Sequence, residues 1–298
     1  MLTRKELETV LVEAGLDRIA NPLAGLSEPC VLVTTHAHPY ERMHVGRSRI
    51  GGWPDLPASI EWPYWRNKPL AFLAQINLAD LTSFDCCQVL PNSGHLYFFY
   101  DCEQSTWGFD PQDRGSWRVL YTDANEADLR HQNVRGLPEQ AIYGACTLTL
   151  HDFLSIPGPE HLSVAPLKLT FEEIEQIEEI ERDLHEMIES KSIQQHFEPH
   201  HQLLGHPREI QGEMQTECQF ASNGYYCGGA SRFQNPPPEL LNGAKDWRLL
   251  FQLDTDDDIQ SGKPGMMWGD CGRLYFWIRH QDLANGRFEY TWMVLQCS

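Results

Sequence analysis

The fold is decided by the segment Trp247-Arg248-Leu249-Leu250-Phe251-Gln252-Leu253 and the following Gly272-Arg273-Leu274-Tyr275-Phe276-Trp277-Ile278. The same pattern occurs upstream, in Leu70-Ala71-Phe72-Leu73-Ala74-Gln75-Ile76 followed by Gly94-His95-Leu96-Tyr97-Phe98-Phe99-Tyr100. Gln75 and Gly94 are 19 residues apart, and Gln252 and Gly272 are 20 apart. Two strand-like segments with a similar spacer therefore occur twice, which we interpret as an internal duplication. Gly205-His206-Pro207 aligns with Gly52-Trp53-Pro54, and this match extends the duplication.

The second segment of each copy is apolar on both faces of the pleat, which is typical of a central strand that is covered on both sides. Further β-branched or alternating stretches predict strands at 31–35, 116–122, 146–150 and 290–295. We predict an α+β fold with largely antiparallel sheets in two related halves.

Two helices are predicted from capping boxes, in which Ser or Thr is followed three residues later by Glu. Thr3 and Glu6 begin an amphipathic helix that runs to about Gly15. Thr170 and Glu173 begin the longest helical pattern in the chain, which is rich in glutamate and runs to Glu189. We expect this acidic helix to connect the halves. The predicted organisation is 1–156 for the N-terminal helix and first half, 157–200 for the connecting helix, and 201–298 for the second half, in one compact body.

The formal net charge is −19, and it is unevenly distributed. Residues 1–150 carry −6, residues 151–200 carry −9, and residues 201–298 carry −4. Such a surface repels phosphate backbones, so nucleic acid is excluded as a partner. A basic protein or a cationic ligand is compatible with it. The acidic side of this helix is therefore either simply exposed to solvent, while the apolar side packs on the core, or a docking surface for a basic partner.

The chain has no apolar signal segment at its start and no stretch of about eighteen apolar residues, so we expect no membrane association. Its nine cysteines form no Cys-x-x-Cys pair and are odd in number. Free thiols in a reducing compartment explain this count, and we expect a cytoplasmic protein.

Several residues are candidates for a ligand-binding site. Arg49, beside the glycine amides of Gly51 and Gly52, can present an anion-binding edge. Trp53 can stack on a ligand or can cap the core from a rigid turn. Gln75 and Gln252 occupy equivalent strand positions, where buried amides need partners, so they either cross-link strands or face a shared cleft. Near the second central strand, the candidates are Trp268 and Asp270, which can also cap the turn there.

Metal sites are a weaker alternative. His36 and His38, and the group His196, His200, His201 and His206, have no recognised ligand spacing. Asp254, Asp256 and Asp258 begin like a calcium loop, but Ile259 replaces its glycine and Gly265 its final glutamate. The EF-hand interpretation therefore fails, and a looser divalent site or a solvated acidic turn remains. No nucleophile, phosphate-loop or dinucleotide motif is present, so we expect no cofactor.

The blocks 49–54, 70–78, 90–99, 203–207, 249–254 and 268–272, taken in this order, resemble the YwqG-like proteins, from roughly residue 25 to the C-terminus. Segment 222–238, which is rich in Gly and Pro, departs from that pattern. This is a family of unknown function, so the resemblance transfers no catalytic residue. It implies a cytoplasmic bacterial α+β protein, and members near toxin–immunity loci imply a toxin-neutralising role.

Two function hypotheses follow. The first is a non-enzymatic binding protein that holds a protein or a small ligand, with a basic toxin as one such partner. The second is a metal-assisted hydrolase that uses Asp254, Asp256, Asp258 and Asp270 with a histidine.

Overall fold

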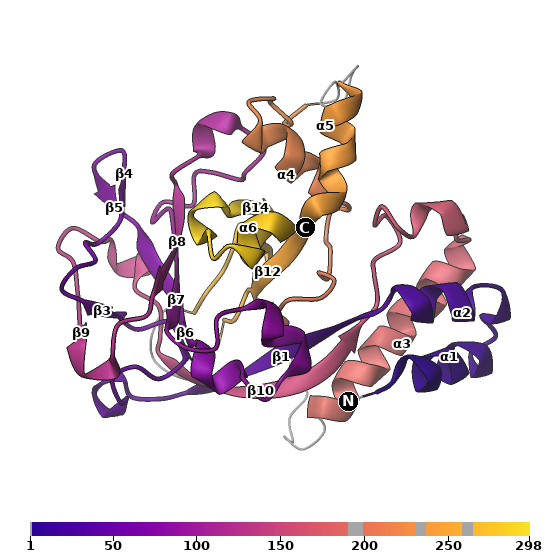
Figure 1. Ribbon diagram of the computed structural model, residues 1–298, viewed down its shortest axis with the longest axis horizontal. Helices are drawn as coiled ribbons and strands as arrows, with labels where there is room; N and C mark the ends of the chain where they lie inside the picture. Colours follow the sequence, from indigo (N-terminus) through magenta and orange to yellow (C-terminus); the bar gives the residue numbers. More distant parts are fainter. Residues whose placement is uncertain (1, 190–198, 230–236, 258–264) are drawn as a thin grey trace.

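The computed structural model describes residues 2–189, 199–229, 237–257 and 265–298, and most of its strands form one antiparallel sheet (Figure 1). The sheet has ten strands in the order β14-β13-β12-β11-β1-β10-β2-β6-β7-β8. Two small ribbons, β3–β9 and β4–β5, lie beside it. The strands of the large sheet are β1 (Glu28–Ala37), β2 (Arg49–Ile50), β6 (Ala71–Asn77), β7 (His95–Tyr100), β8 (Trp117–Thr122), β10 (Cys146–Ser155), β11 (His201–Leu203), β12 (Trp247–Asp254), β13 (Arg273–Arg279) and β14 (Trp292–Gln296). Those of the ribbons are β3 (Asp55–Pro57), β9 (Leu129–His131), β4 (Tyr64–Trp65) and β5 (Lys68–Pro69).

The middle of the sheet is the long pair β1–β10, in which Glu28 to Ala37 pair with Ser155 to Cys146. On one side of this pair follow β2, β6, β7 and β8, which we call the first arm. On the other side follow β11, β12, β13 and β14, which we call the second arm. The sheet curves strongly, so that the two arms face each other across the core (Figure 1).

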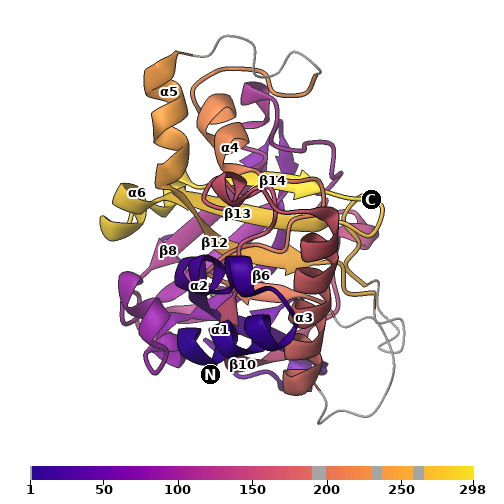
Figure 2. The same cartoon turned by 90° about the vertical axis from the view of Figure 1, so that its right-hand side faces the viewer.

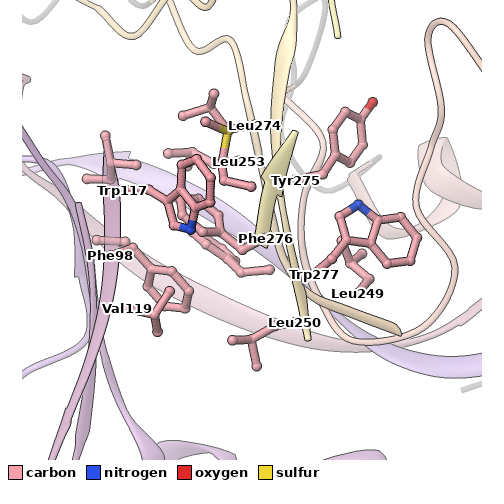
Figure 3. Close-up of a cluster of buried hydrophobic side chains, with 14 of the residues drawn as sticks. Phe98, Trp117, Val119, Leu249, Leu250, Leu253, Leu274, Tyr275, Phe276 and Trp277 are labelled. Carbon is pink, nitrogen blue, oxygen red and sulfur yellow. The ribbon is translucent and has the colours of Figure 1, made fainter. Parts of the chain in front are cut away.

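The inner faces of the arms pack directly on one another. The ring of Phe98 on β7 lies 4.7 Å from that of Phe251 on β12 and 5.1 Å from that of Phe276 on β13, measured between centroids. Trp117 on β8 donates its indole N–H to the Thr291 carbonyl, just before β14, at 2.9 Å. Figure 3 shows Phe98, Trp117 and Val119 facing β13 across this core. The curved sheet is thus almost closed into a barrel.

Three helices cover the outside of the sheet near the β1–β10 pair (Figure 2). They are α1 (Arg4–Glu13), α2 (Asp17–Leu26) and α3 (Phe171–Glu189), and their apolar residues form a cluster with Leu154 and Ile156. The capping boxes predicted at Thr3 and Thr170 are both present. Short helices α4 (Gln215–Ser222), α5 (Pro238–Asn242) and α6 (His280–Ala284) belong to the second arm. No helix among the described residues is long and apolar enough to cross a membrane.

The two arms share several local irregularities. The register of β6 with β7 shifts between Phe72 and Ala74, and that of β12 with β13 shifts between Leu249 and Phe251. Arg49 pairs with Gln75 in the first arm, and Gln202 pairs with Gln252 in the second. After each short strand, two successive residues have positive φ: Gly51 and Gly52 in the first arm, and Leu204 and Gly205 in the second.

The predicted strands are present, with bounds that differ by up to five residues. Helix α2 was not predicted, because Pro22 lies inside it and proline usually ends a helix. The residues of β7 are all buried, as expected of a central strand. Of segment 222–238, residues 230–236 lie outside the described part.

The packing of Phe98 between the arms gives a first prediction. Phe98→Ala should lower the free energy of unfolding by about 3–5 kcal/mol, because the ring is fully buried and its removal leaves a cavity. Phe171→Ala is the matched control, since that ring is 88% exposed and its loss should change stability by less than about 0.5 kcal/mol. Urea unfolding followed by circular dichroism measures both, and equal effects would contradict the observed packing.

Candidate functional site

Arg49 forms a buried ion pair with Asp55, and both side chains are fully buried. The side-chain oxygen of Gln75 accepts from the Arg49 guanidinium at 3.2 Å and from the Asp55 backbone N–H at 2.8 Å. The Gln75 amide nitrogen donates to the Arg47 carbonyl at 3.1 Å. Arg49 is therefore held by the chain's own carboxylate in the place where the sequence predicted an anion-binding edge. Its Nε and Nη1 have no hydrogen-bond partner in the described residues.

This network reaches solvent at His131, whose imidazole is 40% exposed and whose Nδ1 contacts the second carboxylate oxygen of Asp55. The ring of Tyr40 lies 5.0 Å from that of His131 and 5.7 Å from the Arg49 guanidinium. Burial raises the pKa of Tyr40 to about 12, so its hydroxyl stays protonated at neutral pH. The arrangement holds a charge pair inside the first arm and exposes one imidazole at its edge.

Gln252 makes in the second arm the bonds that Gln75 makes in the first. Its amide nitrogen donates to the His200 carbonyl at 2.7 Å, and its oxygen accepts from the Arg208 backbone N–H at 2.9 Å. Arg208 thus takes the backbone place of Asp55, and Gln202 takes the strand position of Arg49. Both glutamines cross-link strands, while the ion pair belongs to the first arm.

Two tyrosines show on which side of the arms the glutamines lie. Tyr97 pairs with Gln75 and donates its hydroxyl to the Asp55 carbonyl at 2.6 Å. Tyr275 pairs with Gln252 and donates to the Arg208 carbonyl at 2.7 Å. Figure 3 shows Tyr275 on the side of β13 that faces away from Phe98. The glutamines therefore lie on the outer faces of their arms and do not face a shared cleft.

The glycines and Trp53 shape the loop that follows Arg49. Gly51 and Gly52 have φ of +71° and +69°, and a Cβ on Gly51 would overlap the Gly144 carbonyl. Any other residue at Gly51 would therefore displace the backbone. Trp53 is half-buried, and its ring packs edge-on against that of Trp62 at 5.9 Å.

The last two candidates lie in separate environments. Trp268 is fully buried and donates its indole N–H to the Asp254 carbonyl at 3.0 Å. Its ring packs against that of Tyr143 at 5.3 Å. Asp270 is exposed, and its backbone carbonyl accepts from Ser298 at 3.2 Å. The structure therefore brings Arg49, Gln75 and the glycine loop together and places Gln252, Trp268 and Asp270 elsewhere.

The candidate metal ligands are engaged in other contacts. Asp254 forms an ion pair with Arg273 at 2.9 Å, and Asp256 accepts from the Thr35 hydroxyl at 2.8 Å. His36 bonds to the Thr149 hydroxyl at 2.9 Å. Asp258 and His196 lie outside the described residues. Within residues 2–189, 199–229, 237–257 and 265–298, no three His, Cys, Asp or Glu side chains come together as a metal site.

With this geometry established, the comparison with protein families becomes informative. A family model described as "Domain of unknown function (DUF1963)" matches residues 48–297. The chain belongs to this family. The DUF1963 match begins one residue before Arg49 and contains both arms, whereas α1, α2 and β1 precede it. A search of the curated proteins finds no match.

Sequence patterns missed one group in this DUF1963 chain, the buried carboxyl of Glu209. Both of its oxygens are buried and have no hydrogen-bond partner in the described residues. Burial, together with the nearby acids Glu213, Glu160 and Glu181, raises its pKa to about 8. One signal for it was available in the sequence. Aligning Arg208 with Asp55 also aligns Glu209 with Leu56, which is buried in the core of the first arm.

The charged face of α3 is the other unusual feature. Glu172, Glu175, Glu179 and Asp183 are all exposed, and their spacing of three or four residues places them on one side of the helix. The opposite side buries Ile177 and Ile180 against α1 and α2.

The buried ion pair gives a second prediction. Arg49→Met should lower the free energy of unfolding by about 3–5 kcal/mol, because the Asp55 carboxylate would stay buried without its cation. Arg42→Met is the matched control, since Arg42 is exposed. Adding Asp55→Leu to Arg49→Met should recover part of the loss. A double variant as unstable as the single one would contradict this account of the pair.

Glu209 gives a third prediction. A carboxyl whose pKa is about 8 in the folded state and 4.5 when unfolded keeps its proton longer in the folded state. Stability should therefore be highest below pH 4.5 for this group and should fall as the pH rises from 4.5 to about 8. Glu209→Gln should flatten that fall. Urea unfolding across this pH range, with Glu239→Gln as an exposed control, measures the difference, and parallel curves would refute it.

Proposed function

We propose that this protein is a non-enzymatic binding protein and that the exposed acidic side of α3 holds a basic protein partner. We place it among YwqG-like members of its family, in the bacterial cytoplasm, where a cationic toxin is such a partner. The observation that carries the proposal is the alignment of Glu172, Glu175, Glu179 and Asp183 on one exposed side of a helix.

The charge of α3 works against its own stability. Its 19 residues contain nine acids and one arginine, and like charges four residues apart destabilise a helix by about 0.2–0.5 kcal/mol per pair. A cationic partner would remove this repulsion on binding. The charge also accelerates encounter with a cationic protein, because attraction between opposite potentials steers diffusion.

An exposed aromatic ring supports the same face. Phe171, the first residue of α3, is 88% exposed and lies next in sequence to Glu172. Large apolar side chains contribute most of the binding energy in many interfaces, whereas charges at the rim set the rate and the salt dependence. Phe171 therefore supplies an anchor beside the charges.

The polar groups of the two arms also favour binding over catalysis. Arg49, Gln75 and Gln252 are buried and hydrogen-bonded to their own chain. Asp254, the first member of the proposed hydrolase cluster, is neutralised by Arg273. These contacts make a fixed scaffold.

We further infer that the two arms derive from one duplicated unit. The shared bulge, the shared pair of positive-φ residues and the twofold occurrence of the glutamine and tyrosine bonds support this inference.

The acidic face gives a fourth prediction. The full chain, immobilised, should capture from a bacterial lysate a basic protein whose binding weakens as salt rises, because exposed charges are screened within about 10 Å at 0.1 M salt. The triple variant Glu175→Gln, Glu179→Gln and Asp183→Asn should bind that protein at least about tenfold more weakly, the effect of roughly 1.4 kcal/mol.

The matched control changes net charge equally at another place. Asp123→Asn, Asp128→Asn and Glu139→Gln remove three exposed acids outside α3. This variant should retain capture of the same protein, as quantified by surface plasmon resonance. A partner that binds independently of salt, or that the two triple variants weaken equally, would refute docking on α3.

A further inference from the structure

The outer face of the second arm contains a cavity of about 400 Å³. The residues that line it include Trp247, Leu249, Trp277, His206 and Gln215. Figure 3 shows Leu249 and Trp277 on the side of the arm that faces away from Phe276. The volume lies within the range of about 300–1,000 Å³ that is usual for small-molecule sites.

Two residues that line this cavity each carry a buried polar atom with no partner in the described residues. These atoms are the indole nitrogen of Trp277, a residue 1% exposed, and the side-chain oxygen of Gln215, a residue 7% exposed. An unsatisfied buried donor or acceptor is costly, so such atoms need a partner. The residues that line the cavity thus carry one unsatisfied donor and one unsatisfied acceptor.

The first arm has a tryptophan, Trp62, at the position that corresponds to Gln215. Trp62 lies seven residues after Asp55, as Gln215 lies seven residues after Arg208. Trp62 donates its indole N–H to the Leu70 carbonyl at 3.0 Å, and Gln215 donates its amide to the corresponding Trp247 carbonyl at 2.8 Å.

The ring of Trp62 therefore covers the outer face of the first arm. It packs edge-on against Phe99 at 5.4 Å, and Phe99 corresponds to Trp277 by the register of β7 and β13. Trp53, which packs beside Trp62, corresponds to His206. Where the first arm holds the chain's own indole, the second arm has a smaller amide and a hollow.

We propose that this cavity binds a planar, uncharged nitrogen heterocycle of about purine size, in the position that the Trp62 indole occupies in the first arm. The ring lies over Trp277 and Leu249. A ring nitrogen or carbonyl accepts from Trp277 Nε1, and an N–H of the ligand donates to the Gln215 oxygen. Both orphaned atoms are then satisfied.

The charges around the cavity agree with an uncharged ring. His206 and His161 line it, and burial lowers the pKa of each to about 4, so both imidazoles are neutral at neutral pH. The other charged lining residues are two bases, Lys245 and Arg248, and two acids, Glu28 and Asp246, so their charges balance. This cavity is lined by no residue of α3, so the inference does not rest on partner binding there.

The fifth prediction concerns this site. Isothermal titration calorimetry of the full chain with adenine, hypoxanthine and benzimidazole should show saturable binding of at least one of them. Trp277→Phe, which installs the first-arm residue and removes the donor, should weaken that binding about tenfold. Gln215→Trp, which installs the first-arm indole, should abolish it by filling the cavity.

Trp292→Phe is the control, because it removes an indole N–H of β14 that is bonded to the Gly108 carbonyl. It should leave binding unchanged and should lower the melting temperature more than Trp277→Phe, whose N–H has no partner in the described residues. If Gln215→Trp does not fold, Trp277→Phe decides. The proposal is overturned if none of the three compounds binds, or if binding survives Trp277→Phe undiminished.

Discussion

The packing of Phe98 against Phe251 and Phe276 is the contact on which the architecture depends. It holds the two ends of one ten-stranded sheet face to face, and it fixes which side of each strand points inward. Because side chains alternate along a strand, the neighbours of an inward residue point outward, except at the register shifts of β6 and β12. The outward rows still contain large apolar side chains, such as Phe99 and Trp277, so each region of the outer surface needs its own cover. The long middle pair is covered by α1, α2 and α3, whereas the first arm is covered by loops and the second in part by α4.

The two arms share the glutamine and differ in the charged side chains around it. Gln75 and Gln252 bond to backbone groups, which exist whatever side chains the neighbouring positions carry. Each arm therefore needs a glutamine at this strand position if the loop after its short strand is to keep the same backbone path. The side chains around them are free to differ, and the first arm has used this freedom for the Arg49–Asp55 pair.

The sequence predicted the strands well because their apolar runs and the repeated pattern are local signals. It also marked Arg49 and the glycine loop, but it could not show that Asp55 would return to neutralise the arginine. That return depends on two successive residues with positive φ, which set the direction of the chain. Likewise, the apolar runs of the central strands gave no sign of which side faces outward, so a shared cleft for Gln75 and Gln252 remained an alternative. Once the register is known, the outward position of Tyr97 and Tyr275 decides it.

The comparison of the arms separates what folding requires from what it does not. The first arm demonstrates that an indole at position 62 can bond the outer carbonyl and bury the floor of the face, so this solution is available to the scaffold. In the second arm, Gln215 makes the equivalent bond to the Trp247 carbonyl. The indole nitrogen of Trp277 and the side-chain oxygen of Gln215 are left without a hydrogen-bond partner in the described residues. A buried donor without a partner lowers stability, and stability considerations alone would favour the filled face. Departures of this kind from the stable solution concentrate at functional sites, and here the departure lies beside the cavity that we propose as a binding site.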